Sequence, residues 1–278
     1  MAVSEGGFVP SSDRFGEVVG EIVRCVGCGH GSLLELPSIA EVDAAYHQAE
    51  DPVSLDEEAG QVATADRDLR LIERHVEVGR LVDLGCWTGS FAVAAQRRGW
   101  TAEGVEPSRW AATRARDRGV SVQEATIEDV ALPDAAYRAV VVCDVLEHLF
   151  DPGTALDRVW AALEPGGVAF LTVPDAGSVV ARAFGRRWWA VLPMHVQYFS
   201  RRSMRVLLER HGFTVLEVRT HPKVFSAAYY GDRLATFWSP SGRLVRAVLD
   251  RTGSCRPVAP DLRDRMAVVA QRPAGAGP

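Results

Sequence analysis

Short apolar runs alternate with amphipathic stretches through the middle of the chain. Five of these runs have strand length, and in most of the gaps between them apolar residues recur at helical spacing. Such an alternation predicts a parallel sheet covered by helices on both faces, which is the doubly wound α/β class. The predicted strands are Gly79–Leu84, Ala102–Val105, Ser121–Gln123, Ala139–Cys143 and Val168–Val173, and the predicted helices are Phe91–Arg98, Ser108–Arg116 and Ala155–Leu163.

The two ends of the chain differ from this middle part. Residues 1–60 are polar and rich in Gly, Ser and Asp, and we interpret them as an arm. A helix over Asp66–Val76 is expected to lead into the main domain, which we place at residues 61–278. Towards the end of the chain, Phe213–Val218 and Arg265–Gln271 have strand character and are expected to add two further strands.

Composition agrees with one large domain carrying appended segments. The 278 residues are 47% hydrophobic and 24% charged, as in a globular protein. The formal net charge of -5 gives no positive field, so we expect no nucleic-acid partner. The basic stretches Arg182–Arg187 and Arg201–Arg205 are short and are interpreted as solvated helix faces.

Three features of the sequence favour a cytoplasmic location. Residues 1–20 lack the pattern of a secretory signal, and no apolar stretch is long enough to span a bilayer. The five cysteines form no disulfide framework, as expected in a reducing compartment.

The most informative segment is Arg80–Gly89, which reads RLVDLGCWTG. A predicted strand ends at Asp83, and Gly85 and Gly89 allow the backbone to turn tightly and approach a ligand, because no Cβ intervenes. The next predicted strand ends at Glu106, twenty-three residues after Asp83. A carboxylate in this position accepts hydrogen bonds from ribose hydroxyls in Rossmann-type folds, so Glu106 is the predicted ribose ligand.

These residues resemble the first motifs of the class I S-adenosylmethionine-dependent methyltransferases, whose loop usually reads acidic-x-Gly-x-Gly-x-Gly. Asp83, Gly85 and Gly89 match this loop, and Trp87 stands at its middle glycine, where the indole is expected to narrow the methionine end of the pocket or to stack beside the cofactor. The resemblance covers roughly residues 66–221. It implies S-adenosylmethionine as the cofactor and a Rossmann-like, mostly parallel seven-stranded sheet with an antiparallel last strand.

Three later segments fit the same family. Thr126 and Ile127 follow the third strand, where the family contacts the adenine ring, although Thr126 stands where many relatives carry Asp. Asp144 belongs to the segment that closes the fourth strand beside the reactive sulfonium, and the resemblance implies that it contacts the cofactor. Leu163–Gly167 is similar to the turn before the fifth strand, where Pro ends a helix and Gly reverses the chain.

Two neighbouring residues after the fourth strand are candidates for catalysis. A sulfonium methyl group is already activated, so a base is needed only where the acceptor must lose a proton. His148 is the leading candidate base, because it follows the strand closely and an ordinary histidine pKa is about 6.5. The alternative is a structural histidine that hydrogen-bonds Asp151 or Asp144. Glu147 is a candidate to orient His148, or to face a helix amino terminus.

His195 is the second candidate base. It follows an aromatic segment with Trp188 and Trp189, inside residues 176–200, where relatives often place an element that covers the substrate. The alternative interpretation is that these two indoles, together with Phe199, belong to the core.

Cys25 and Cys28 have the CxxC spacing of a zinc knuckle. Many similar methyltransferases carry a knuckle made from two such pairs, and a structural zinc site needs four ligands. The next cysteine after Cys28 is Cys86 in the cofactor loop, and only His30 and His47 lie near enough to help. We therefore expect no bound metal, and we interpret the segment as a degenerate knuckle that folds over the domain.

An insertion at residues 223–260 separates the last two predicted strands. It carries part of a helical apolar stripe together with Tyr229, Tyr230 and Trp238. We interpret this segment as a surface that closes over the acceptor or joins two copies into a homodimer, because exposed aromatic patches commonly mark interfaces. A membrane contact ranks below these two uses, since the segment lacks a basic polar face.

The predicted partner is a small-molecule acceptor, and the family favours O-methylation of a sugar or secondary metabolite without specifying which. Two other functions stay open. A nucleotide-dependent oxidoreductase would also use Glu106 and the glycine turn, but the loop lacks the GxGxxG form. A non-catalytic methyltransferase-fold scaffold is kept open by Trp87, by Thr126 and by Arg138, which replaces the usual acidic residue after Tyr137.

Overall fold

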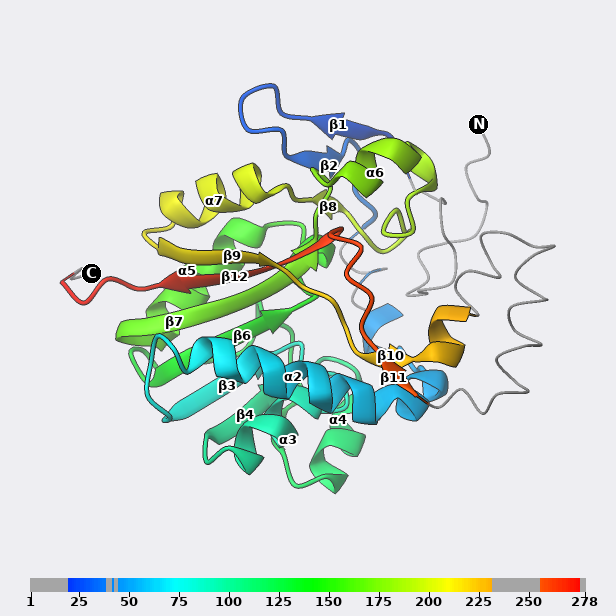
Figure 1. Ribbon diagram of the computed structural model, residues 1–278. Coiled ribbons are helices and arrows are strands. Elements are labelled where there is room, and N and C mark those ends of the chain that lie inside the picture. The colour runs from blue at the N-terminus through cyan, green and yellow to red at the C-terminus, as the bar shows by residue number, and fades with distance from the viewer. Residues whose placement is uncertain (1–19, 39–41, 43–44, 232–255, 276–278) are drawn as a thin grey trace.

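The computed structural model describes residues 20–38, 42, 45–231 and 256–275. Its central sheet has seven strands in the order β5 (Ser121–Gln123), β4 (Thr101–Val105), β3 (Arg80–Leu84), β6 (Tyr137–Cys143), β7 (Leu163–Pro174), β12 (Arg265–Gln271) and β9 (Thr214–Thr220). The first five are parallel, whereas β12 is antiparallel to both of its neighbours (Figure 1). The predicted Rossmann-like sheet with an antiparallel last strand is therefore confirmed.

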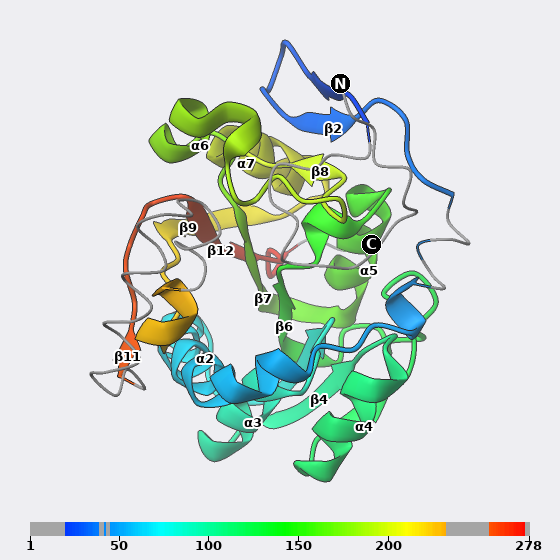
Figure 2. The same ribbon diagram turned by 90° about the vertical axis from the view of Figure 1, so that its right-hand side faces the viewer.

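Helices cover both faces of this sheet (Figures 1 and 2). One face carries α2 (Glu58–Ile72), α3 (Ser90–Arg97) and α4 (Arg109–Asp117), and the other carries α5 (Pro152–Ala162) and α7 (Arg201–Arg210). Helix α2 begins eight residues earlier than the helix predicted over Asp66–Val76, because the 3-10 helix η1 (Pro52–Glu57) leads directly into it. Residues within the predicted polar arm therefore form regular structure.

The start of β7 differs from the prediction. Leu163–Gly167 was expected to be a turn, and the helix before it was expected to include Leu163. In the structure Leu163 already has extended φ and ψ angles and pairs with Tyr137 of β6. The register then shifts before Val168, and Gly166 takes a φ of 85° within this irregularity. These residues therefore form a distorted first part of β7 in place of the expected chain reversal.

Two apolar layers hold the sheet between its helices. Successive residues of a strand face opposite sides, so in β6 Val140 and Val142 join the cluster with α5 and α7, whereas Ala139 and Val141 join the cluster with α2 and α3. All four side chains are fully buried. Because burying one valine contributes about 1.5 to 3 kcal/mol, this double layer fixes the strands so that β3, β4 and β6 end along one edge.

The amino-terminal hairpin and the segment before α7 form a second, smaller sheet. Strands β1 (Ile22–Arg24) and β2 (Gly31–Leu33) are antiparallel, and β8 (Gln197–Tyr198) adds the third strand (Figure 1). Residues 176–200 also contain α6 (Val179–Phe184) and the 3-10 helix η3 (Gly185–Arg187). The side chains of Trp188 and Phe199 are only 2% and 1% exposed, as the core interpretation predicts.

Only the ends of the predicted insertion lie within the described residues. Strands β10 (Phe225–Ser226) and β11 (Pro257–Val258) pair with each other, and residues 227–231 are helical. Tyr229 and Tyr230 are half-buried and pack with Phe225, whereas Trp238 lies outside the described residues. Over the described part of the chain, no helix combines the length and apolar character needed to cross a membrane.

Candidate active site

A cavity of about 810 Å³ lies at the carboxyl ends of the central strands. Open parallel sheets bind their ligands at this edge, and the volume suits a small molecule. The residues predicted from the sequence that line the cavity are Asp83, Gly85, Trp87, Glu106, Thr126, Ile127, Asp144 and His148. Three other predicted residues, Gly89, Glu147 and His195, are not among the residues that line it.

The loop after β3 turns sharply beneath the cavity. The backbone N–H groups of Gly85 and Cys86 both donate to the carbonyl of Val105, at 2.8 and 3.0 Å. Gly85 has a φ of 76°, a region that glycine enters without steric cost. A Cβ at Gly85 would also lie 2.4 Å from Cγ2 of Val145, whereas Gly89 forms the N-cap of α3. Gly85 is therefore the glycine that this turn requires most.

Trp87 occupies the same left-handed region with a φ of 49°. Its backbone N–H donates to Oε2 of Glu106 at 2.9 Å, and its indole Nε1 donates to Oγ of Ser54 at 3.1 Å. The indole also lies 5.6 Å from the ring of Trp110. The indole is therefore anchored on the cavity wall, and its part in narrowing the pocket or stacking beside the cofactor stays a prediction.

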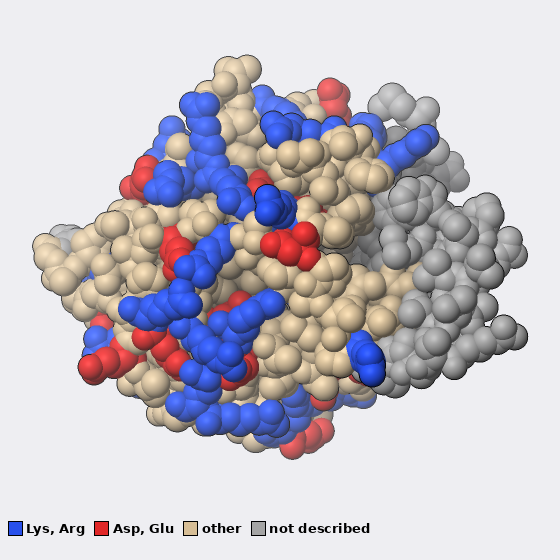
Figure 3. All heavy atoms as spheres, in the orientation of Figure 1, with Lys and Arg blue, Asp and Glu red and all other residues tan. Residues whose placement is uncertain are grey.

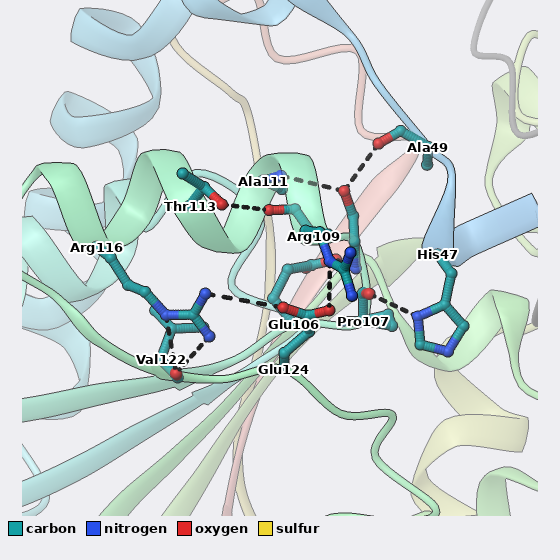
Figure 4. A network of polar contacts seen from close by, with 11 residues as sticks. His47, Ala49, Glu106, Pro107, Arg109, Ala111, Thr113, Arg116, Val122 and Glu124 are labelled. Atoms are coloured by element: carbon teal, nitrogen blue, oxygen red, sulfur yellow. Dashed lines mark hydrogen bonds and ion pairs between the residues drawn. The ribbon is translucent and has the colours of Figure 1, made fainter.

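Glu106 directly follows β4 and is only 4% exposed. Its two carboxylate oxygens accept backbone hydrogen bonds from Trp87 and Ser108, at 2.9 and 2.8 Å. Figure 4 shows that the amino-terminal segment reaches this loop, where the Ser108 hydroxyl donates to the carbonyl of Ala49 at 2.8 Å. The carboxylate is thus held in a fixed orientation at the cavity edge.

Asp83 and Glu106 share an environment that disfavours their charged forms. Burial, and secondly the Glu106 carboxylate, raise the pKa of Asp83 to about 8. Burial also raises the pKa of Glu106 to about 7, although its two backbone donors and His47 act in the opposite direction. A ligand that brings positive charge or hydroxyl donors to this end of the cavity would stabilise both carboxylates.

Binding of S-adenosylmethionine, the cofactor that the sequence resemblance implies, is therefore expected to release protons. The pKa of each carboxyl group lies above its ordinary value in the free protein, and binding should lower it, so affinity should rise between about pH 6 and about pH 8. Calorimetry in two buffers of different ionisation enthalpy measures the released protons. Glu106→Gln should release fewer, and equal binding heats in both buffers for the wild type would contradict this expectation.

Replacing Asp83 with Asn should stabilise the free protein while weakening cofactor binding. Because the folded pKa of Asp83 is raised, its contribution to stability is present below about pH 4 and is lost as the pH rises through about 8. The neutral amide should therefore raise the melting temperature more at about pH 8 than at about pH 5.5. Thermal unfolding at both pH values and titration with S-adenosylhomocysteine measure the two effects. A lower melting temperature at the higher pH would count against this account.

Thr126 and Ile127 lie in the turn after β5. The Thr126 hydroxyl accepts the backbone N–H of Asp129 at 3.2 Å and donates to its carboxylate at 3.0 Å. Ile127 is 6% exposed, packs against the core and also lines the cavity. Since the hydroxyl is already engaged, the apolar side chain and the backbone are the groups that this turn offers to an adenine ring. The adenine contact itself stays a prediction.

Asp144 was predicted to contact the cofactor, and the structure places it in an ionic network. It forms ion pairs with Lys223 and Arg265, and the Thr172 hydroxyl donates to it at 3.2 Å. Although burial alone would raise its pKa, Arg265 and Lys223 hold the pKa of Asp144 well below its usual range. Both cations were missed by sequence reasoning, because they lie far along the chain in segments without a motif.

The structure brings together the three residues predicted to be catalytic. One ligand atom from each of Glu147, His148 and His195 lies within 4.8 Å of the others. The two imidazole rings meet edge to face with their centroids 4.8 Å apart. Nδ1 of His148 donates to the carbonyl of Met194 at 3.1 Å, and Nδ1 of His195 donates to the carbonyl of Ala190 at 2.8 Å. We refer to these three residues as the Glu-His-His cluster.

Burial controls the charge of this cluster. It lowers the pKa of His148 to about 4 and that of His195 well below the ordinary value. Burial, and secondly the Asp144 carboxylate, raise the pKa of Glu147 to about 8. Oε2 of Glu147 is buried without a hydrogen-bond partner among the described residues. Asp151, the alternative partner considered for His148, instead caps the amino terminus of α5.

Tyr46 is a third residue that sequence reasoning missed. Its ring lies 6.0 Å from that of His148, and it lines the cavity. Burial, and secondly the Glu147 carboxylate, raise the pKa of Tyr46 above its usual range. The spacing of Val42 and Tyr46, four residues apart and both lining the cavity, was the helical signal that could have identified this part of the arm.

Cys25 and Cys28 lie at the turn between β1 and β2, where both are reduced. Of the two histidines that might have completed a zinc site, His30 hydrogen-bonds the side chain of Gln197 at 2.8 Å. His47 donates to the carbonyl of Pro107 at 2.9 Å. The hairpin does fold over the domain through β8, but a zinc-knuckle origin stays a prediction.

The fold, the glycine loop and the buried carboxylate after β4 define the class I S-adenosylmethionine-dependent methyltransferases. A family model described as a methyltransferase domain matches residues 55–218, which is more than half of the chain. The chain belongs to this family, and S-adenosylmethionine is the family's cofactor. The oxidoreductase alternative is therefore set aside.

Curated relatives include enzymes that methylate carbon and enzymes that methylate oxygen. The C-methyltransferase NovU of Streptomyces niveus is 29% identical over 166 residues, which are 58% of this chain and 37% of NovU. The ubiquinone biosynthesis O-methyltransferase of Actinobacillus pleuropneumoniae is 33% identical over 104 residues, which are 34% of this chain and 44% of that enzyme. The chain thus spans about two fifths of the length of the relatives it matches.

Solved structures show the same fold at low identity. An S-adenosylmethionine-dependent methyltransferase from Mesorhizobium loti has a TM-score of 0.52 at 19% identity, over 75% of this chain and 98% of that one. A second from Thermotoga maritima has a TM-score of 0.51 at 21% identity, over 76% of this chain and 89% of that one. These similarities establish the architecture and leave the acceptor open.

Proposed function

We propose that this protein transfers the methyl group of S-adenosylmethionine to a small-molecule acceptor. The observation that carries the proposal is that one cavity has two chemically different ends. Asp83 and Glu106 border it at the ends of β3 and β4, while His148 borders it after β6, close to Glu147 and His195. The first end suits the cofactor, and the second suits an acceptor placed in line with the sulfonium methyl group.

Each cofactor residue has a distinct part in this proposal. Glu106 accepts hydrogen bonds from the ribose hydroxyls, and Asp83 orients the glycine loop and faces the ammonium group. Gly85 lets the backbone approach the ligand, and Ile127 covers the adenine ring. Positioning of the acceptor against the methyl group can supply about 7 to 11 kcal/mol of the barrier.

The acceptor is proposed to be a sugar or secondary metabolite that receives the methyl group on oxygen. Transfer to oxygen needs a group that accepts the hydroxyl proton of the acceptor or stabilises the resulting oxyanion. The buried Glu-His-His cluster lies at the end of the cavity where such a group is needed. Because the relatives include both a C-methyltransferase and O-methyltransferases, transfer to carbon is the outcome to be tested against it.

Residues 176–200 are proposed to cover the acceptor end, within a methyltransferase domain at residues 61–278 and with an arm at residues 1–60. Two contacts support a covering role. The backbone N–H of Val196 donates to the carbonyl of Glu147 at 2.8 Å, and that of Leu33 donates to the carbonyl of Val196 at 3.0 Å. The arm, the covering segment and the candidate catalytic cluster are thus linked by backbone hydrogen bonds.

The surface supports a small acceptor over nucleic acid. Figure 3 shows Lys and Arg side chains forming a band across one face, interrupted by acidic residues. Several arginines of the described chain are paired with carboxylates, as in Arg70 with Asp66 and Arg219 with Glu217. Paired charges release fewer counterions, so they contribute less to phosphate-backbone binding.

Methyl transfer from labelled S-adenosylmethionine tests the proposal. The protein is incubated with sugars, phenols and metabolite extracts, and labelled products are identified by mass spectrometry, which separates O-methyl from C-methyl products. We expect S-adenosylhomocysteine binding and at least one labelled product that is absent with Glu106→Ala. A protein that binds neither S-adenosylmethionine nor S-adenosylhomocysteine would instead be a scaffold with the methyltransferase fold.

A further inference from the structure

The Glu-His-His cluster has the composition of a metal site as well as that of a proton-handling site. Glu147 is 2% exposed and His195 is 7% exposed, so the cluster differs from the acidic groups that gather on protein surfaces. Among the described residues it is the one group of three potential ligands whose donor atoms lie close enough to share an ion. The buried Oε2 of Glu147 has no hydrogen-bond partner within the described chain.

Backbone contacts prepare both histidines for coordination. A carbonyl oxygen can only accept a hydrogen bond, so Met194 and Ala190 fix the ring protons of His148 and His195 on Nδ1. In a neutral ring the lone pair is then on Nε2. Metal-binding histidines almost always donate their other ring N–H to such a carbonyl or carboxylate, which sets the tautomer and the ring orientation.

We propose that Glu147, His148 and His195 bind one divalent transition-metal cation beside the acceptor end of the cavity. Two imidazoles and one carboxylate are a ligand set used by zinc and by non-haem iron, and three protein ligands leave open positions for substrate. Ligand atoms about 2.1 Å from such an ion lie roughly 3 to 3.5 Å apart. Atoms that are now up to 4.8 Å apart would therefore approach one another by up to about 1.3 to 1.8 Å.

The surrounding charges can accommodate this cation. Asp144 lowers the local positive charge, and it already neutralises part of the charge of Lys223 and Arg265. Asp144 thus offsets part of the positive charge that Lys223 and Arg265 bring near the cluster, and Glu147 supplies the carboxylate that would bind the ion. His148 is the ligand that reaches the cavity wall, so the open positions of the ion would face the acceptor.

This inference rests on the proposed function and specifies its acceptor. An acceptor hydroxyl bound to the cation would lose its proton to water more readily, because a divalent cation stabilises the oxyanion. The oxygen then forms a bond to the methyl carbon, the carbon-sulfur bond breaks, and its electron pair stays on sulfur as S-adenosylhomocysteine leaves. The acceptor class is therefore a hydroxyl compound that can coordinate a metal ion through the oxygen that reacts.

Metal binding is measured directly with cobalt and manganese. Protein without a polyhistidine tag, carrying Cys25→Ser and Cys28→Ser so that the hairpin thiols cannot bind, is stripped with chelator and dialysed against Co²⁺ or Mn²⁺. We expect one equivalent of metal by elemental analysis and a visible Co²⁺ spectrum. Glu147→Gln, His148→Gln and His195→Gln should each weaken Co²⁺ binding by at least roughly tenfold, since even outer partners of metal ligands cost 10 to 100-fold.

His75→Gln is the matched control, because His75 also faces a carboxylate, that of Glu217, but lies outside the cavity. It should bind Co²⁺ like the parent protein. S-adenosylhomocysteine titration shows that each variant is folded and separates the two proposals. If the parent binds S-adenosylhomocysteine but less than about 0.1 equivalent of either metal, or if His195→Gln binds Co²⁺ as the parent does, the metal site is wrong. If it binds metal but not S-adenosylhomocysteine, the proposed function fails instead.

Discussion

Replacing Glu106 with Ala is expected to weaken S-adenosylhomocysteine binding by at least roughly tenfold. Two ribose hydroxyls would lose a charged acceptor, and a hydrogen bond to a charged group contributes about 1.5 to 3 kcal/mol, where 1.4 kcal/mol corresponds to tenfold in affinity. The loss also removes the acceptor of the backbone N–H groups of Trp87 and Ser108, so the loop should become less ordered. Calorimetric titration measures the affinity, and thermal unfolding of the free protein measures the structural part.

Two further variants separate these effects. Glu106→Gln keeps the shape and one carbonyl acceptor, so it should fall between the wild type and Glu106→Ala. Glu124→Ala removes a nearby carboxylate that pairs with Arg109 and Arg116 on the protein surface (Figure 4), and it should bind like the wild type. Unchanged affinity in a folded Glu106→Ala protein would refute the ribose assignment.

The strands and the cofactor loop could be predicted because their signals are local. The apolar run that ends at Asp83 predicts a strand by itself, and the glycine turn after it predicts a tight backbone turn without help from distant residues. The positions of Gly85 and Glu106 follow from that pattern, since parallel strands end at one edge of the sheet. The positive φ of Gly85 and the burial of Glu106 agree with those requirements.

The acceptor end could be predicted only in part, because its residues meet through tertiary contacts. His195 reaches His148 across 46 intervening positions by way of β8, which pairs with a hairpin near the amino terminus. Arg265 reaches Asp144 because it opens β12, which is separated from β6 only by β7, and Lys223 follows β9, the neighbour of β12. Neither pairing has a period or a motif, so sequence reasoning missed both cations.

The amino-terminal segment shows why a polar composition was misleading. Tyr46 lines the cavity, and Ser54 accepts a hydrogen bond from the Trp87 indole in the cavity wall. The residues around them in the sequence are nevertheless acidic and rich in turn formers. A short segment that borders a cavity needs few apolar residues, because the main domain supplies most of the buried surface. Its composition therefore resembles that of a linker even though its backbone meets the Glu106 loop at Ser108.

Gly85→Ala is expected to lower the free energy of unfolding by about 2 to 5 kcal/mol and to weaken cofactor binding with it. The left-handed backbone costs an L-residue about 1 to 2 kcal/mol, and overpacking adds about 1 to 3 kcal/mol. The overpacking would arise because the new Cβ lies 2.4 Å from Val145. Urea unfolding and S-adenosylhomocysteine titration measure the two losses.

Gly119→Ala is the matched control for this substitution. Gly119 has a φ of 83°, but a Cβ there would meet no atom within 4 Å, so only the backbone cost of about 1 to 2 kcal/mol should appear. Adding Val145→Ala to Gly85→Ala should recover the overpacking part, because it removes the methyl group that the new Cβ meets. Equal destabilisation by Gly85→Ala and Gly119→Ala would show that the contact with Val145 does not constrain the loop, and the cofactor turn would then depend on backbone conformation alone.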